Sequence, residues 1–169
     1  MLKYFRMFAD YNRWANDKLY AAARNLSDAE YHENKGAFFG SLHSTLNHLL
    51  VADRVWMHRF TGEGDKLRSL DAVLFDDLAG LSAARQAQDR RMIDWIDGLD
   101  EASLARAVTY TALSAPTEVS QPLGPLLSHV FNHQTHHRGQ CHMTLTALGK
   151  PSLVLDLVYF LRDDGQQWL

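Results

Sequence analysis

The stretch from His129 to His142 reads HVFNHQTHHRGQCH and holds five of the chain's nine histidines. His129, His133 and His137 are spaced four residues apart, which on an α-helix places them one turn above one another. Two imidazoles placed in this way can bind one ion, because neutral imidazole is a good ligand for zinc, nickel, copper or iron. The spacing therefore predicts a long helix that carries part of a metal site.

Apolar residues at helical spacing predict three further long helices before this one. The four expected ranges are about 3–25, 41–60, 82–97 and 122–148, with residues 66–81 mostly loop and a last short helix within 152–161. Between 106 and 121 β-forming residues are common, and Ser114-Ala115-Pro116 is expected to turn a small hairpin. The predicted fold class is therefore all-α: a four-helix bundle with a short irregular or hairpin insert before the fourth long helix. On the first helix, the expected apolar stripe is Tyr4, Phe8, Tyr11, Ala15, Leu19 and Ala22.

The length of 169 residues fits one domain, residues 1–169, which can bury a core without disulfides or structural ions. The net charge is -3 and no Lys/Arg cluster stands out, so we expect no nucleic-acid partner. The single cysteine, Cys141, excludes an intrachain disulfide and gives no support to a secreted, disulfide-built fold. Charged residues break the first 17 residues every few positions, so we expect no signal segment, no membrane partner and a cytoplasmic protein.

His133 and His137 lie on a helix stripe that is otherwise apolar or small and should face the core. Its other members are Leu126, Val130, Cys141, Thr144 and Leu148. Histidines that face a core are costly unless they find partners, so the alternative to a metal site is a hydrogen-bonded core pair.

A pair on one helix is an incomplete site, because catalytic zinc usually takes three protein ligands and keeps one position open. His48 is the best candidate for the third ligand, since it lies among the apolar residues of the second long helix. His43 falls about 140° from His48 around a 3.6-residue helix and His58 about 80°, so both are expected at the surface or its boundary.

The sequence leaves the roles of several other residues undecided. His129 is the main rival as a ligand, or it could donate a hydrogen bond to one. His136 points about 100° away from His137, and two residues so placed rarely share an ion. Cys141 could supply a thiolate, but a lone buried cysteine is more often an apolar filler. Asp53 could orient an imidazole or form a salt bridge at the helix edge.

Two other metal patterns are excluded by the sequence. His-Glu-x-x-His, the pattern of zinc proteases, is absent. No glutamate is followed three places later by histidine, as the di-iron site of ferritin-like bundles requires. A mononuclear site with three histidines remains.

Two segments of the chain resemble the DinB family: HLLVADRVW at 48–56 and NHQTHHRGQ at 132–140. YNRWAN at 11–16 and DLVY at 156–159 resemble it more weakly, so the resemblance covers nearly the whole chain. It implies a four-helix bundle, commonly a homodimer, with one divalent metal held by His48, His133 and His137. It also implies chemistry with low-molecular-weight thiols, since related proteins transfer or isomerise groups with bacillithiol, mycothiol or glutathione.

The leading hypothesis is a metal-dependent enzyme of the thiol S-transferase type with a small-molecule substrate. The expected cofactors are one ion, zinc or nickel, and a low-molecular-weight thiol that the sequence does not identify. No general base can be assigned. The alternatives are a metal-dependent hydrolase, in which the ion activates water, and a non-catalytic metal-binding protein of the stress response.

Overall fold

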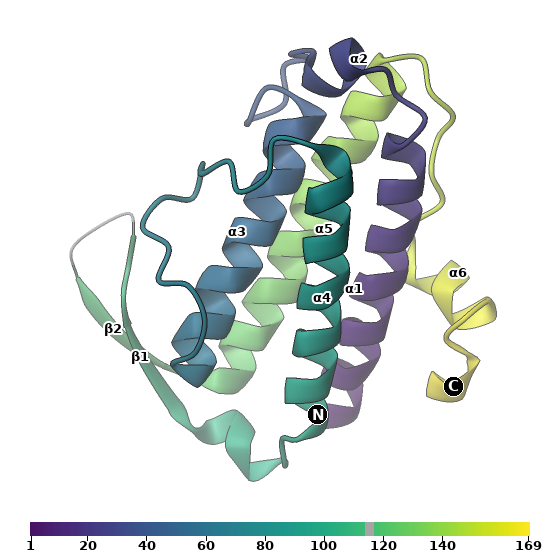
Figure 1. Cartoon of the computed structure of the whole chain (residues 1–169). Coiled ribbons are helices and arrows are strands. Elements are labelled where there is room, and N and C mark those ends of the chain that lie inside the picture. The colour runs from purple at the N-terminus through teal and green to yellow at the C-terminus, as the bar shows by residue number, and fades with distance from the viewer. Residues whose placement is uncertain (114–116) are drawn as a thin grey trace.

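The computed structural model describes residues 1–113 and 117–169, and four long helices lie side by side in it (Figure 1). The predicted fold class, an all-α four-helix bundle with a hairpin before the fourth long helix, is confirmed. In the described part of the chain, no helix is both long and apolar enough to cross a membrane. The long helices are α1 (Leu2–Ala23), α3 (Leu42–Thr61), α4 (Leu78–Asp97) and α5 (Leu123–Ala147), and the short ones are α2 (Asp28–His32), η1 (Ala102–Ala105), α6 (Leu157–Arg162) and η2 (Gln166–Trp168).

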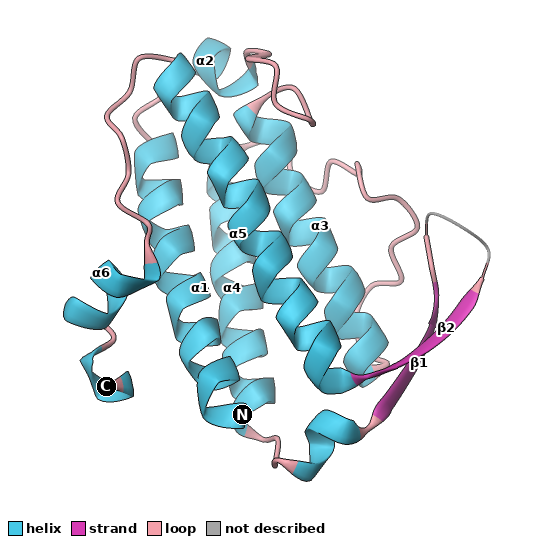
Figure 2. Cartoon of the chain, turned by 180° about the vertical axis from the view of Figure 1, so that it is seen from behind, coloured by secondary structure: helices cyan, strands magenta, loops and turns pink. Residues whose placement is uncertain are grey.

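The segment 62–77 determines the direction of α4 relative to α3. It returns along the outside of the bundle, so that α3 and α4 run in the same direction (Figure 1). α1 packs against α4 and α5, and α3 packs against the same two helices. Figure 2 shows the bundle from behind, with α5 in front between α1 and α3. His48 and Asp53 of α3 contact His133 and Gln134 of α5, so the middle of α3 faces the middle of α5.

Local sequence signals explain where the long helices begin and end. The Ser41 hydroxyl accepts a hydrogen bond from the Ser44 amide and caps α3, which ends at Gly62 in the left-handed conformation that glycine tolerates best. Asp77 caps α4 by accepting from the Gly80 amide. The expected start of this helix at Ser82 was therefore wrong, because the cap lies one turn earlier, in a segment expected to be loop.

The insert before α5 is a two-stranded antiparallel hairpin. Strand β1 (Ala107–Thr111) pairs with β2 (Glu118–Pro122), and Thr109 lies opposite Ser120. The predicted turn at Ser114-Ala115-Pro116 lies outside the described residues. Near the C-terminus, the expected short helix is confirmed but begins only at Leu157.

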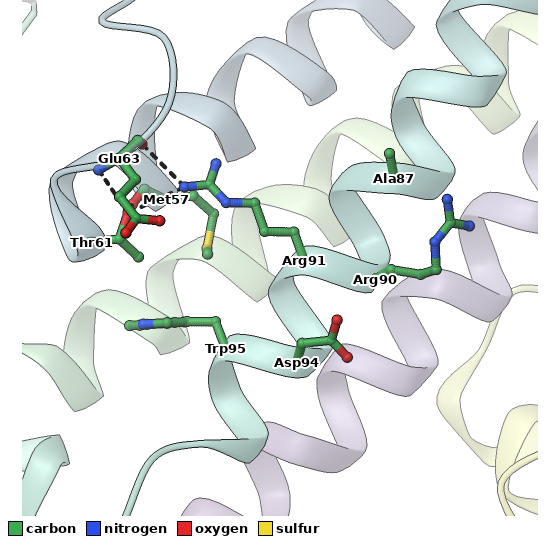
Figure 3. Close-up of a pocket in the computed structure, with 8 residues that line it drawn as sticks. All are labelled: Met57, Thr61, Glu63, Ala87, Arg90, Arg91, Asp94 and Trp95. Atoms are coloured by element: carbon green, nitrogen blue, oxygen red, sulfur yellow. Dashed lines mark hydrogen bonds between the residues drawn. The ribbon is translucent and has the colours of Figure 1, made fainter.

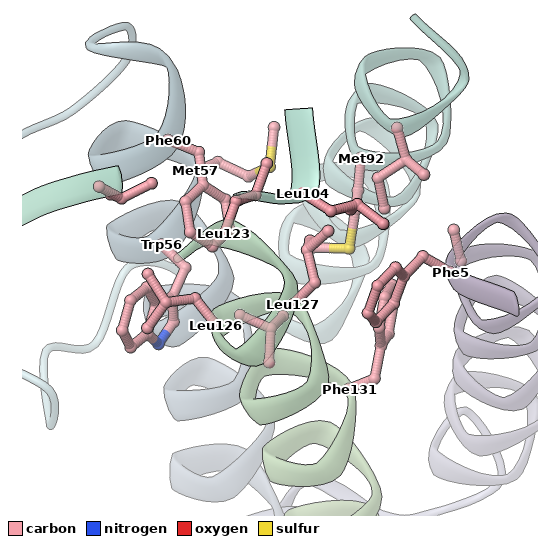
Figure 4. Close-up of a cluster of buried hydrophobic side chains, with 14 of the residues drawn as sticks. Phe5, Trp56, Met57, Phe60, Met92, Leu104, Leu123, Leu126, Leu127 and Phe131 are labelled. Atoms are coloured by element: carbon pink, nitrogen blue, oxygen red, sulfur yellow. The ribbon is translucent and has the colours of Figure 1, made fainter. Parts of the chain in front are cut away.

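Apolar side chains fill the two ends of the bundle. Figure 4 shows the end near the hairpin, where Trp56, Phe60, Leu123 and Phe131 belong to one buried cluster. At the other end, a second cluster contains Leu19, Leu42, Leu46, Leu145 and Cys141. Burial of this apolar surface is the main driving force for packing the four helices together.

A layer of buried polar side chains also lies in the bundle. Arg85 on α4 forms ion pairs with Asp53 on α3, at 2.7 Å, and with Asp89 one turn away, at 2.9 Å. Asn16 on α1 donates to Asp89, and Arg138 on α5 donates to Asn12. The layer joins all four long helices, because each contributes at least one member.

The expected stripe on α1 is only partly correct. Tyr11, Ala15 and Leu19 are buried, but Tyr4 is 62% exposed, and Phe8 and Ala22 are only partly buried. α1 contacts α4, α5 and α6, and Leu2, Phe5 and Trp14 are buried although they lie off the expected stripe. Its buried surface is therefore wider than one stripe, and an apolar period alone does not locate it.

Candidate metal centre

His48, His133 and His137 come together where α3 faces α5. Each offers one ligand atom, and these three atoms all lie within 4.8 Å of one another. The Nε2 atoms of His48 and His133 are 3.3 Å apart. No other group of three histidine, cysteine or carboxylate residues meets this condition in residues 1–113 and 117–169. The structure thus brings together the three residues expected from the sequence.

Hydrogen bonds fix the orientation of two of the three rings. The Nδ1–H of His48 donates to the carbonyl oxygen of Leu70 at 2.7 Å. The Nδ1–H of His137 donates to Oε1 of Gln140 at 2.9 Å. In a neutral imidazole only one nitrogen carries a proton, so Nε2 of both rings is unprotonated and carries a lone pair. Histidine ligands of metals typically have this arrangement.

The surroundings keep the three imidazoles neutral. Burial, reinforced by the neighbouring His137 and His48, lowers the pKa of His133 to about 3. Burial also lowers the pKa of His48 and that of His137. Neutral rings are the form that binds a metal, so the lowered pKa values favour the form of the cluster that can act as a ligand.

A pocket of about 460 Å³ opens onto the cluster, and its apolar lining residues are Phe38, Phe39 and Leu70. The Phe39 ring stacks on His48 with centroids 3.9 Å apart, and Phe38 next to it is 81% exposed. Asp71, His136 and Gln140 supply the remaining polar lining. The cluster is therefore reachable by a small molecule from one side, while the bundle closes the other.

A larger hollow of about 560 Å³ lies between α3 and α4 (Figure 3). Its lining contains no histidine or cysteine, and its Arg91 donates to the Thr61 hydroxyl and to the Glu63 carbonyl oxygen. This hollow is larger than the pocket at the histidine cluster, but only the smaller pocket is lined by a group of side chains that could bind a metal. The smaller pocket is therefore the better candidate for a functional site.

The remaining histidines do not join the cluster. The His129 ring is 5.7 Å from that of His133 and 5.1 Å from that of Trp56, so this residue packs beside the cluster and is not one of its three members. His136 is exposed and does not belong to the three-residue group, as expected from its offset of about 100° from His137, and its Nε2 lies 3.3 Å from the Gln140 amide nitrogen. His43 was wrongly expected near the surface: it is buried, with Nε2 3.1 Å from the carbonyl oxygen of Phe75, because the loop before α4 covers it.

Cys141 and Asp53 have structural surroundings. Cys141 is buried among leucines, and burial raises the pKa of its thiol to about 12, so it is an apolar filler. Asp53 neither bonds an imidazole nor lies at a helix edge. It pairs with Arg85 inside the bundle and accepts a hydrogen bond from Gln134, at 2.6 Å, because α4 and α5 enclose this face of α3.

Two partners of the cluster were not anticipated from the sequence. Gln140 follows His137 by three residues, a helical spacing that could have indicated the contact. The sequence did not indicate the carbonyl group of Leu70 as a partner of His48. Any residue can supply a backbone acceptor, and the path of the loop is set by tertiary structure.

Comparison with known proteins shows the family of the chain. The sequence profile of the DinB family matches residues 1–168. The chain is 27% identical over 165 residues to Protein DinB of Bacillus subtilis (strain 168), an alignment that covers 93% of this chain and 92% of the relative. The chain belongs to the DinB family and is a distant homologue of the Bacillus subtilis protein.

Proposed function

We propose that His48, His133 and His137 bind one divalent transition metal ion, zinc or nickel, through their ring nitrogens. The observation that carries the proposal is the convergence of three imidazoles, two of which have Nδ1–H bound to an acceptor and Nε2 unprotonated. Three neutral nitrogen donors suit these ions, which bind imidazole well. The apolar stacking of Phe39 on His48 supports this use of the cluster, since it holds the ring in place without competing for its nitrogen.

We further propose that the protein is an enzyme of the thiol S-transferase type. Three protein ligands beside an open pocket are typical of catalytic rather than structural metal sites. The ion would supply one kind of chemistry, lowering the pKa of a substrate thiol so that it reacts as thiolate. Phe38 and Phe39 would contact the apolar part of the second substrate and exclude water from it, because they line the approach to the histidines.

Turnover with a panel of thiols tests the enzymatic proposal. The metal-loaded protein is mixed with a fluorogenic alkyl chloride and with glutathione, bacillithiol or mycothiol. We expect thiol-dependent product that is lost on chelation, restored by metal and absent in His133→Ala. The thiol should also change the visible spectrum of cobalt-loaded protein in a Cys141→Ser background, where the protein's own sulfur cannot contribute.

The alternatives give different results in the same assays. A hydrolase would cleave activated esters in a metal-dependent manner without thiol. A non-catalytic metal-binding protein would bind the ion and lose it in His133→Ala. It would turn over neither the thiol and alkyl chloride nor the ester. Either result would contradict the transferase proposal and leave the metal site standing.

A further inference from the structure

A second pocket, of about 410 Å³, lies between the C-terminal half of α3, the loop that follows it and strand β1. It shares no lining residue with the histidine pocket. Three cationic side chains line it, those of Arg59, Lys66 and Arg68, against one carboxylate, that of Asp65. Asp65 is in addition 3.5 Å from Arg54, so its charge is shared with a fourth cation. The pocket is therefore electropositive.

Arg59 is held rigidly in this pocket without an acidic partner. Its guanidinium lies over two rings, 4.5 Å from the centre of Trp56 and 4.3 Å from that of Tyr110. One of its nitrogens donates to the carbonyl oxygen of Thr111 at 3.3 Å. Among the described residues no ion pair of Arg59 is found, and burial lowers the pKa of its guanidinium. A half-buried charge of this kind is stabilised when an anion joins it.

His58 also lines this pocket, but it adds no accessible donor to it. Its Nδ1 atom has no hydrogen-bond partner within residues 1–113 and 117–169 and is buried, so a ligand in the open pocket would not reach it. Arg91, which belongs to α4, differs from Arg59 in its hydrogen bonds, because its guanidinium already donates to two protein oxygens (Figure 3).

We propose that this pocket binds the carboxylate or phosphate group of a small anionic ligand. Arg59 would supply the preorganised guanidinium, whose planar donors match both groups. Lys66 and Arg68, exposed on the loop, would supply flanking charge. The volume falls within the range of small-molecule sites. The proposal does not rest on the metal or on the transferase activity.

The loop connects this pocket with the histidine cluster. Arg68 lies two residues before Leu70, whose carbonyl oxygen accepts the hydrogen bond from His48. The acidic group could thus belong to a substrate that also reaches the cluster or to a separate effector. A substrate and an effector would both present a carboxylate or phosphate to the pocket. They differ in whether their binding depends on the histidine cluster.

The test is an NMR titration of ¹⁵N-labelled, metal-free protein at low salt with inorganic phosphate and, separately, with succinate. We expect saturable shifts of the Arg59 Nε–H signal and of the amides of residues 109–112. Arg59→Gln should weaken binding by about tenfold, the worth of a hydrogen bond to a charged group. The double variant Lys66→Ala/Arg68→Ala changes only exposed side chains and should also weaken it. Arg90→Gln, an exposed change of equal charge on α4, should not.

The proposal is overturned if neither anion gives saturable shifts in the wild type. It is equally overturned if both pocket variants keep wild-type affinity, or if Arg90→Gln weakens binding as much as they do. Repeating the titration with glutathione and metal-loaded protein separates the two sources. A substrate binds more tightly when metal is present, whereas a separate effector binds equally with and without it.

Discussion

The Nδ1 atom of His48 lies 2.7 Å from the carbonyl oxygen of Leu70, so a loop 22 residues further along the chain fixes the proton on that side of the ring. The consequence is that Nε2, which lies 3.3 Å from Nε2 of His133, carries the lone pair. Gln140 acts on His137 in the same way. Two of the three rings thus have the proton placement and the hydrogen-bonded acceptor that are typical of histidine ligands of metals.

Gln140→Leu should weaken metal binding while leaving the stoichiometry unchanged. The substitution removes the acceptor that orients the His137 ring, and loss of such a partner typically lowers metal affinity about 10- to 100-fold. Competition with a chelating dye measures the affinity. Gln166→Leu, an exposed change of the same kind near the C-terminus, is the control. Equal affinity in Gln140→Leu and wild type would show that the hydrogen bond does not support the ligand.

The metal-free protein should lose stability as the pH falls from about 6.5, the ordinary pKa of histidine. Burial and the nearby His137 lower the pKa of His133 in the folded state, to about 3. Between these two values the unfolded chain binds a proton that the folded chain does not. The free energy of unfolding therefore decreases as the pH decreases.

Urea unfolding of metal-free protein at several pH values between 7 and 5 measures this dependence. His133→Gln should show a smaller decrease than wild type, because the site that resists protonation is gone. The remaining decrease in the variant comes from His48, His129 and His137, whose pKa values are also lowered by burial. Identical pH dependence in wild type and variant would show that His133 titrates normally in the folded protein.

Arg85→Met should destabilise the fold by about 3–5 kcal/mol, because it leaves two buried carboxylates without their counter-charge. Arg85 is 2% exposed and contacts both Asp53 and Asp89. Denaturant unfolding at pH 7 gives the difference. Arg90→Met on the exposed face of the same helix should change stability by no more than about 0.5 kcal/mol. A similar small effect for Arg85→Met would mean that the buried pairs are dispensable.

The regular parts of the fold and the histidine cluster were readable from the sequence, because both follow helical periodicity. The i, i+4 pair of His133 and His137 and the apolar surroundings of His48 were enough to place three imidazoles on facing surfaces. The buried charges were not readable in the same way. Arg85 and Asp89 also have i, i+4 spacing, which is equally typical of an exposed ion pair, and only the packing of four helices buries them.

The loops were the least predictable region for a related reason. The carbonyl of Leu70 and the burial of His43 both depend on the path of the segment 62–77, which no local pattern in the sequence specifies. Asp77 did carry a signal, since aspartate is a preferred helix cap, but the apolar period begins later. The apolar periodicity thus predicted α4 but not its first turn.

The metal content of purified, reconstituted protein tests the central claim most directly. Wild type and three variants, His48→Ala, His133→Ala and His137→Ala, are loaded with zinc or nickel, dialysed and analysed by plasma mass spectrometry. His58→Ala and His142→Ala serve as controls, since neither residue belongs to the cluster. The account predicts about one ion per chain in wild type and in both controls, since three imidazoles bind one ion, and a loss of bound ion in each of the three variants. Full stoichiometry and unchanged affinity in all three variants would contradict it.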